Sequence, residues 1–172
     1  MAQASTRFTR IAVDTNFLRN LATGIDIARD ALSVIRDRLP NPVVLVPPTV
    51  IDELTLAFTE PSNEMERKEA GMALRVMRGD WGFQPVDLVP VGHGIVDIIA
   101  DKIRERGYLP DEERNDSLIL AEAALMGCVL LVTSDRHLLD VPPGPLRLLL
   151  DSHSVSTPLI VSPHRLVRDY FR

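Results

Sequence analysis

The chain has 172 residues, enough for one domain with a sizeable core, and its hydrophobic fraction of 45% excludes a disordered protein. A formal net charge of -5 argues against a protein that binds nucleic acid mainly through an excess of basic residues. Because no apolar run is long enough to cross a membrane and the first ten residues lack the apolar stretch of a signal peptide, we expect a cytoplasmic protein that makes no membrane contact.

Short apolar runs alternate with helical patterns along the whole chain. Residues 1–9 are expected to form a flexible lead-in, and Thr49 is predicted to cap the helix that follows it. In chain order, we predict a strand over 10–13, a helical stretch over 17–38 broken near Gly24, a strand over 43–46, helices over 50–58 and 63–79, a strand over 86–89, a helix over 92–107, a helix from Asp116 to 126, a strand over 129–132, a short strand or hairpin arm over 146–150, a strand over 158–161 and a terminal helix over 163–170. This alternation predicts a single α/β domain over 1–172 with a mainly parallel sheet.

Four acidic residues are predicted to meet at one edge of this sheet. Asp14 and Asp135 follow two buried strands, Asp116 opens the helix leading into the second of them, and Glu53 lies in the first turn of another helix. Ligand sites of open α/β sheets lie at the carboxyl ends of the strands, and right-handed crossovers bring all four acids there. Glu53 is preferred to Asp52 because it borders the apolar arc of its helix, whereas Asp52 lies nearly opposite that arc.

This grouping predicts a metal site that acts on phosphate esters. Carboxylates close together repel one another unless cations lie between them, and a hard oxygen donor set suits Mg²⁺ or Mn²⁺ better than Zn²⁺. Two such ions, roughly 3.5–4 Å apart, activate a water and stabilise the leaving oxygen of a phosphodiester. Asn16 and Ser134 are predicted to orient carboxylates or water behind the ligands, whereas Thr133 is assigned only to hydrogen bonding at the end of its strand.

The motifs that carry these acids resemble those of PIN-domain nucleases. The matching segments are VDTNFL at 13–18, VIDEL at 50–54, NDSLILAEA at 115–123 and LVTSDRHLL at 131–139, and LIVSPHRL at 159–166 resembles the last strand and helix of that family. The resemblance implies a three-layer α/β/α fold and a Mg²⁺- or Mn²⁺-dependent ribonuclease. It implies catalytic and metal-binding roles for Asp14, Glu53, Asp116 and Asp135, and accessory roles for Asn16 and Ser134.

The same resemblance implies RNA as substrate, a homodimer and, for a VapC-like toxin, an antitoxin protein as partner. The extended regions over 59–92 and after 141 leave a stand-alone PIN-domain protein open as well.

Three other functions compete with this interpretation. A haloacid-dehalogenase phosphatase needs a second Asp where Asn16 stands, and a response-regulator receiver needs a Lys after its last strand, but no Lys follows Lys102. A non-catalytic PIN-like module for RNA binding or protein interaction is the third, and the four intact acids argue against it.

Other polar residues near the predicted edge receive simpler interpretations. Arg19, Arg114 and Arg136 are candidates for phosphate contacts, with ordinary solvated positions as the alternative. The acidic run over 111–113 is expected to be a solvated loop, with an additional metal ligand as the alternative. His137 is the one histidine near the predicted site and is expected to be a surface residue.

Overall fold

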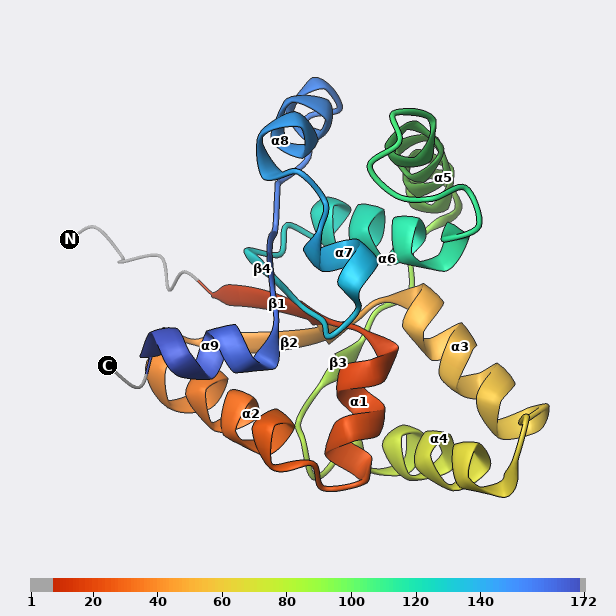
Figure 1. Cartoon of the computed structure of the whole chain (residues 1–172), viewed down its shortest axis with the longest axis vertical. Helices are drawn as coiled ribbons and strands as arrows, with labels where there is room; N and C mark the ends of the chain where they lie inside the picture. The colour runs from red at the N-terminus through yellow and green to blue at the C-terminus, as the bar shows by residue number, and fades with distance from the viewer. Residues whose placement is uncertain (1–7, 171–172) are drawn as a thin grey trace.

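The computed structural model describes residues 8–170 and has a five-stranded, all-parallel sheet at its centre (Figure 1). The strand order is β3-β2-β1-β4-β5. The strands are β1 (Thr9–Val13), β2 (Pro42–Val46), β3 (Gln84–Pro85), β4 (Leu130–Val132) and β5 (Leu159–Val161). Buried apolar residues dominate the three central strands, as expected for a sheet covered on both faces. Residues 1–7 of the expected lead-in lie outside the described residues.

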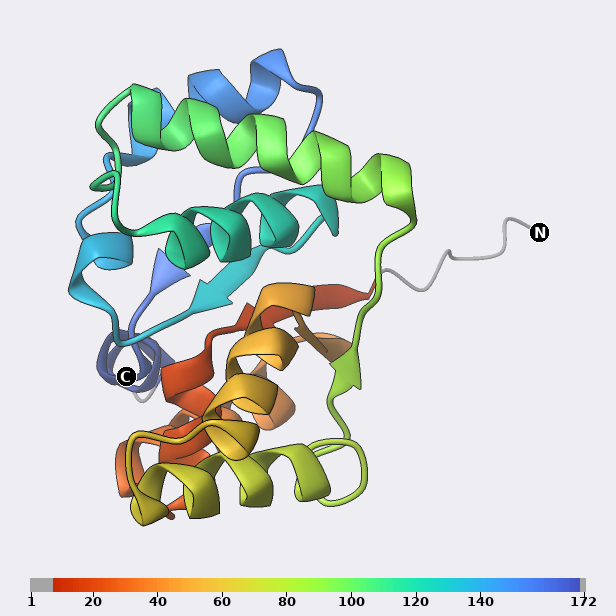
Figure 2. The ribbon, with the colours of Figure 1, turned by 90° about the vertical axis from the view of Figure 1, so that its right-hand side faces the viewer.

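Helices form a layer on each side of the sheet, as Figures 1 and 2 show. One side carries α1 (Thr15–Ala22), α2 (Asp26–Arg38) and α9 (Pro163–Tyr170), and the other carries α5 (Pro90–Glu105), α6 (Arg114–Leu125), α7 (Arg136–Leu139) and α8 (Pro143–Ser152). The pair α3 (Pro48–Thr59) and α4 (Glu64–Val76) pack against each other, and both contact α1. The predicted three-layer α/β/α fold is confirmed.

Helix α6 is the most deeply buried of the helices that border the candidate site. It packs against α5 and α3, which explains why its sequence is apolar almost all round. Its Glu122 is also buried, and it accepts hydrogen bonds from the hydroxyl of Thr49 at 2.7 Å and from the backbone N–H of Thr49 at 3.2 Å. The first turn of α3 is therefore tied to the middle of α6.

The beginning of α3 differs from the prediction. The helix starts at Pro48, with Pro47 in the capping position, so Thr49 lies inside the first turn and caps nothing. Proline fits the first helical position because its missing N–H has no partner there in any helix and its φ is already helical. The side chain of Thr49 is instead free to donate to Glu122.

The predicted strand over 86–89 is wrong, because β3 comes earlier and has only two residues. Gln84 and Pro85 pair with the last two residues of β2, and the N–H of Val86 still donates to Val46 at 3.0 Å. Because β2 ends at Val46, the residues after Val86 have no strand residues beside them to pair with.

The predicted strand or hairpin arm over 146–150 is also wrong, because these residues lie within α8. Its buried residues Leu146, Leu149 and Leu150 have helical spacing, and Pro143 occupies the start of the helix. The short helix α7, which no sequence pattern predicted, begins directly after Asp135. Within residues 8–170, no helix combines the length and apolar composition needed to span a membrane.

Candidate metal and active site

The candidate site lies where the two central strands β1 and β4 end side by side. The chain leaves β1 toward α1 and leaves β4 toward α7, on opposite faces of the sheet, which is the topology that opens a crevice between two strands. The backbone N–H of Asp14 donates to Val132 at 3.2 Å. This hydrogen bond extends the pairing by one residue and places Asp14 next to Thr133.

Asp14 is the most buried acid of the site, with a relative exposure of 3%. One carboxylate oxygen accepts from the backbone N–H of Phe17 at 2.7 Å and so caps α1, and the other accepts from the Thr133 hydroxyl at 2.5 Å. The pKa of Asp14 is raised to about 6, mainly by burial and to a smaller extent by the nearby charges of Asp135 and Glu53, while both hydrogen bonds act in the opposite direction. A buried carboxyl group next to other acids is poorly stabilised as an anion unless a cation joins it.

Glu53 and Asp116 approach Asp14 from α3 and α6. The carboxylate of Glu53 accepts hydrogen bonds from the Thr15 hydroxyl and from the Asn115 side-chain amide, the latter at 2.8 Å. Burial raises the pKa of Asp116 to about 7, with further contributions from neighbouring acids that include Asp135, Glu53 and Asp14. The charges of the other three predicted acids are therefore near enough to raise the pKa of Asp116.

Asp135 completes the group from the end of β4. Its side chain caps α7 by accepting from the N–H of His137 at 2.7 Å and of Leu138 at 3.3 Å. Its own N–H donates to the hydroxyl oxygen of Thr133 at 2.9 Å. The Thr133 hydroxyl thus connects Asp14 and Asp135 directly.

An open cavity of about 390 Å³ lies in front of these acids. Its lining includes Asp14, Glu53, Asp116 and the predicted accessory residue Asn16, which is exposed to solvent. Ser134 is exposed and does not line this cavity. The structure therefore brings three of the predicted acids and Asn16 to the lining of one cavity, whereas the half-buried Asp135 and the exposed Ser134 are not part of that lining.

The three arginines considered for phosphate contacts lie in different settings. Arg19 lines the cavity, but its guanidinium donates to Glu69 at 2.7 and 2.8 Å and lies 3.7 Å from Glu66. Arg136 lies 3.5 Å from Asp140, which directly follows its own short helix, and Arg114 is exposed. Arg19 is therefore already neutralised by acids, which leaves cations as the natural partners for a phosphate in this cavity.

The donor set fits a hard divalent cation. Carboxylate oxygens are the preferred ligands of Mg²⁺ and Mn²⁺, and the pKa values of Asp14 and Asp116, raised mainly by burial and also by neighbouring acids, belong to carboxylates whose charged form a bound cation would stabilise. Sequence reasoning missed three neutral donors that hold these acids: Thr15, Asn115 and Thr133. Each lies within two residues of a predicted acid in the sequence, and that short separation is the signal available for finding them.

Comparison with known proteins adds two findings. The family model described as "PIN domain" matches residues 11–142. The crystal structure of VapBC2 from Rickettsia felis, bound to a DNA fragment from their promoter, contains a chain of similar fold, with a TM-score of 0.61 and 13% identity over 90% of this chain and 98% of that chain. No curated protein sequence matches.

Proposed function

The chain belongs to the PIN domain family, whose members are generally nucleases, and from this premise we propose that it is a metal-dependent endoribonuclease. It would hydrolyse phosphodiester bonds of RNA, and the active site would be formed by Asp14, Glu53, Asp116 and Asp135. The observation that carries the proposal is the grouping of four acids from four chain segments, three of which line one open cavity, with raised pKa values for Asp14 and Asp116. Acids arranged in this way bind cations, and cations bind phosphates.

Each residue has a separate task in this proposal. Asp14 and Asp116 hold the cations most directly, while the Thr133 hydroxyl fixes Asp14 relative to Asp135. Thr15 and Asn115 orient Glu53 by donating to its two carboxylate oxygens. We assign Asn16 to water or carboxylate orientation at the cavity wall and Ser134 to the outer rim.

Bound Mg²⁺ or Mn²⁺ would supply Lewis-acid activation of a water and stabilisation of the leaving oxygen. The chain itself contributes rigid ligand positions, since three of the four acids lie on or directly beside elements that pack against the sheet core. An RNA phosphate would repel the uncompensated carboxylates, so we expect substrate binding to depend on the cation as well.

We further propose an antitoxin protein as partner, a homodimer as assembly and the cytoplasm as location. The fold similarity to a chain of a VapBC complex supports the antitoxin partner. The two alternatives from the sequence, a paired toxin and a stand-alone PIN-domain protein, differ in whether the neighbouring gene encodes such a protein.

The direct test is RNA cleavage by the full chain with Mn²⁺, with Mg²⁺ and with a chelator. Cleavage that needs a divalent ion and is lost in Asp116→Asn supports the proposal, with Asp111→Asn in the exposed preceding loop as the matched control. RNA binding without cleavage under all ion conditions would instead favour a non-catalytic module and refute the enzyme.

A further inference from the structure

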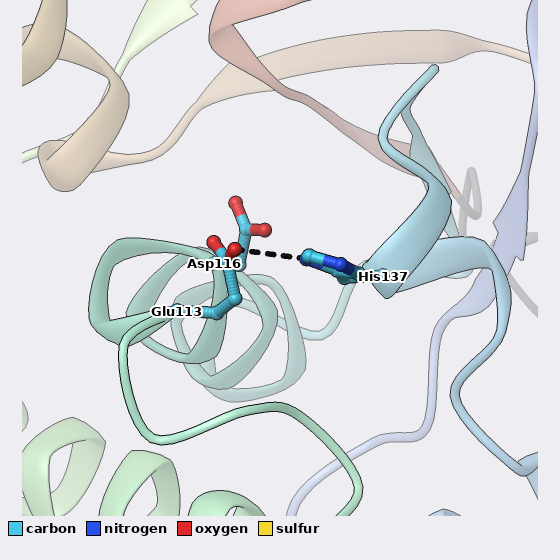
Figure 3. Close-up of side chains that lie close together, drawn as sticks. All are labelled: Glu113, Asp116 and His137. Atoms are coloured by element: carbon cyan, nitrogen blue, oxygen red, sulfur yellow. Dashed lines mark hydrogen bonds and ion pairs between the residues drawn. The ribbon is translucent and has the colours of Figure 1, made fainter.

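Glu113, Asp116 and His137 form a second group of possible ligands at the edge of the four-carboxylate site. Each offers one ligand atom, and these three atoms lie within 4.8 Å of one another. Figure 3 shows Glu113 and Asp116 together on one side and His137 facing them from the other. The first two lie just before and within the first turn of α6, and His137 lies on α7, two residues after Asp135.

The imidazole is held toward the carboxylates rather than left free in solvent. Its Nδ1 lies 2.8 Å from a carboxylate oxygen of Glu113, and half of the His137 side chain remains exposed. Glu113 and Asp116 are partly buried, and the charge of Glu113 contributes to the raised pKa of Asp116. A nitrogen donor therefore lies beside two oxygen donors at a place where negative charge accumulates.

We propose that Glu113 and His137 extend the metal site at Asp116, and that the imidazole nitrogen makes the site prefer Mn²⁺ to Mg²⁺. This inference rests on the proposed function, because it takes Asp116 as a metal ligand. Mg²⁺ favours oxygen ligands in a strict octahedral arrangement, whereas imidazole suits transition-metal ions. An ion held by all three side chains would replace the hydrogen bond between Glu113 and His137 with one bond to each.

The decisive test is the electron spin echo of Mn²⁺ bound to the full chain, together with calorimetric affinities for Mn²⁺ and Mg²⁺. A directly bound imidazole gives a ¹⁴N modulation of the echo, which we expect in the natural chain and not in His137→Gln. That variant should lose at least the roughly 10- to 100-fold in Mn²⁺ affinity that residues supporting a ligand contribute, and much less in Mg²⁺ affinity. His164→Gln, at an exposed position on α9, is the matched control and should leave both readouts unchanged.

Two further variants make the test independent of any one substitution. His137→Asp replaces nitrogen with oxygen and should shift the preference toward Mg²⁺, and Glu113→Gln should weaken Mn²⁺ binding while keeping the ¹⁴N modulation. If the natural chain binds Mn²⁺ and Asp14→Asn abolishes it, but His137→Gln leaves the modulation and the Mn²⁺ to Mg²⁺ ratio unchanged, this inference is overturned and the four-carboxylate site stands. If the natural chain binds neither ion, the inference and the proposed function both fail.

Discussion

The carboxylate of Asp14 is almost inaccessible to solvent, yet it lies close enough to Asp135 and Glu53 to be repelled by both. Its two oxygens already accept hydrogen bonds from Phe17 and Thr133, so its orientation is fixed before any ligand arrives. Such a residue lowers the stability of the metal-free chain and contributes to binding when a cation is present. The two effects can be separated by one substitution.

Asp14→Asn should reduce metal-dependent RNA cleavage at least about a hundredfold, because even residues that only support ligands contribute about 10- to 100-fold. The same change should raise the free energy of unfolding without metal, since it removes a buried charge while keeping an acceptor for the Phe17 N–H. Cleavage assays and urea titrations with and without Mn²⁺ measure both effects. The exposed neighbour of Glu53 provides the control Asp52→Asn. If Mn²⁺ raised the free energy of unfolding of Asp14→Asn as much as that of the natural chain, Asp14 would not be a metal ligand.

Thr133→Val tests the hydroxyl that connects Asp14 and Asp135. Valine keeps the volume of this fully buried residue but removes the donor, so we expect about a 10- to 100-fold loss of Mn²⁺ affinity by calorimetry. Thr133→Ser retains the hydroxyl and should bind Mn²⁺ nearly as well as the natural chain. Equal losses in both variants would assign the effect to packing of the methyl group instead.

Among the secondary-structure elements, α3 and α6 carry Glu53 and Asp116, and two contacts hold these helices in register. Asn115 donates to Glu53 at the site, and one turn earlier on α3 Thr49 donates to the buried Glu122. Burial raises the pKa of Glu122 to about 7, although the Thr49 hydrogen bonds and the charge of His93 act in the opposite direction. The Thr49 contact therefore compensates in part for a buried carboxylate and fixes the helix that presents Glu53.

Thr49→Val should lower the free energy of unfolding by about 1–3 kcal/mol at pH 8, because Glu122 loses its hydroxyl donor while buried. The loss should be smaller at pH 5, where Glu122 is protonated in the folded chain. Urea titrations at both pH values measure this difference. Thr55→Val is the matched control on the same helix, since Thr55 is exposed and donates only to its own turn. Identical losses of unfolding free energy in the two variants would show that the Thr49–Glu122 contact contributes no more to stability than a hydrogen bond within one helix.

The elements that were predicted correctly are those whose patterns are local. The buried strands that end before Asp14 and Asp135, and the predominantly apolar helix α6, follow from runs of adjacent residues. The prediction for 146–150 was wrong because a short apolar run has no periodicity that distinguishes a strand from a helix. The predicted bounds of β3 were wrong because the length of that strand depends on where β2 ends.

The same contrast between local and distant signals applies to the candidate site. The four acids could be predicted because each lies at or near the end of a strand or the start of a helix, and the PIN-domain resemblance of their motifs is confirmed by the family match. The donors that hold the acids were missed because their partners are distant in sequence. Thr15 donates to a residue 38 positions away, Asn115 to one 62 away and Thr133 to one 119 away. Only the folded chain brings these pairs together.

At the scale of the whole molecule, Asp14, Asp116 and Glu122 give metal-free stability an unusual dependence on pH. Their pKa values rise from 3.8, 3.8 and 4.5 to about 6, 7 and 7 on folding. Between about pH 4 and pH 7 the folded chain therefore binds more protons than the unfolded chain, and the free energy of unfolding falls as pH rises through this window. Glu66 and Asp169 have lowered pKa values, so their loss of stabilisation is confined to lower pH.

Thermal unfolding of the metal-free chain should accordingly give a higher midpoint at pH 5 than at pH 8. Mn²⁺ at pH 8 should raise the midpoint again, by the equivalent of about 2.7 kcal/mol when its free concentration is a hundred times the dissociation constant. Glu122→Gln should reduce the slope with pH but retain the response to Mn²⁺, because Glu122 lies outside the metal site. A midpoint that rises steadily from pH 5 to pH 8 without metal would contradict the raised pKa values.

The backbone hydrogen bonds on the two sides of the site are expected to open at different rates, because β1 is a central strand and α7 is a short helix. The amides of β1 lie between two paired strands, whereas α7 has four residues and begins at the Asp135 cap. Hydrogen–deuterium exchange should therefore be slowest in β1, close to the rate of global unfolding, and fast at His137 and Leu138, which open locally. Metal binding should slow exchange in α7 far more than in β1. The expected pattern is a site whose β1 side resists local opening without metal and whose α7 side gains protection when the metal binds.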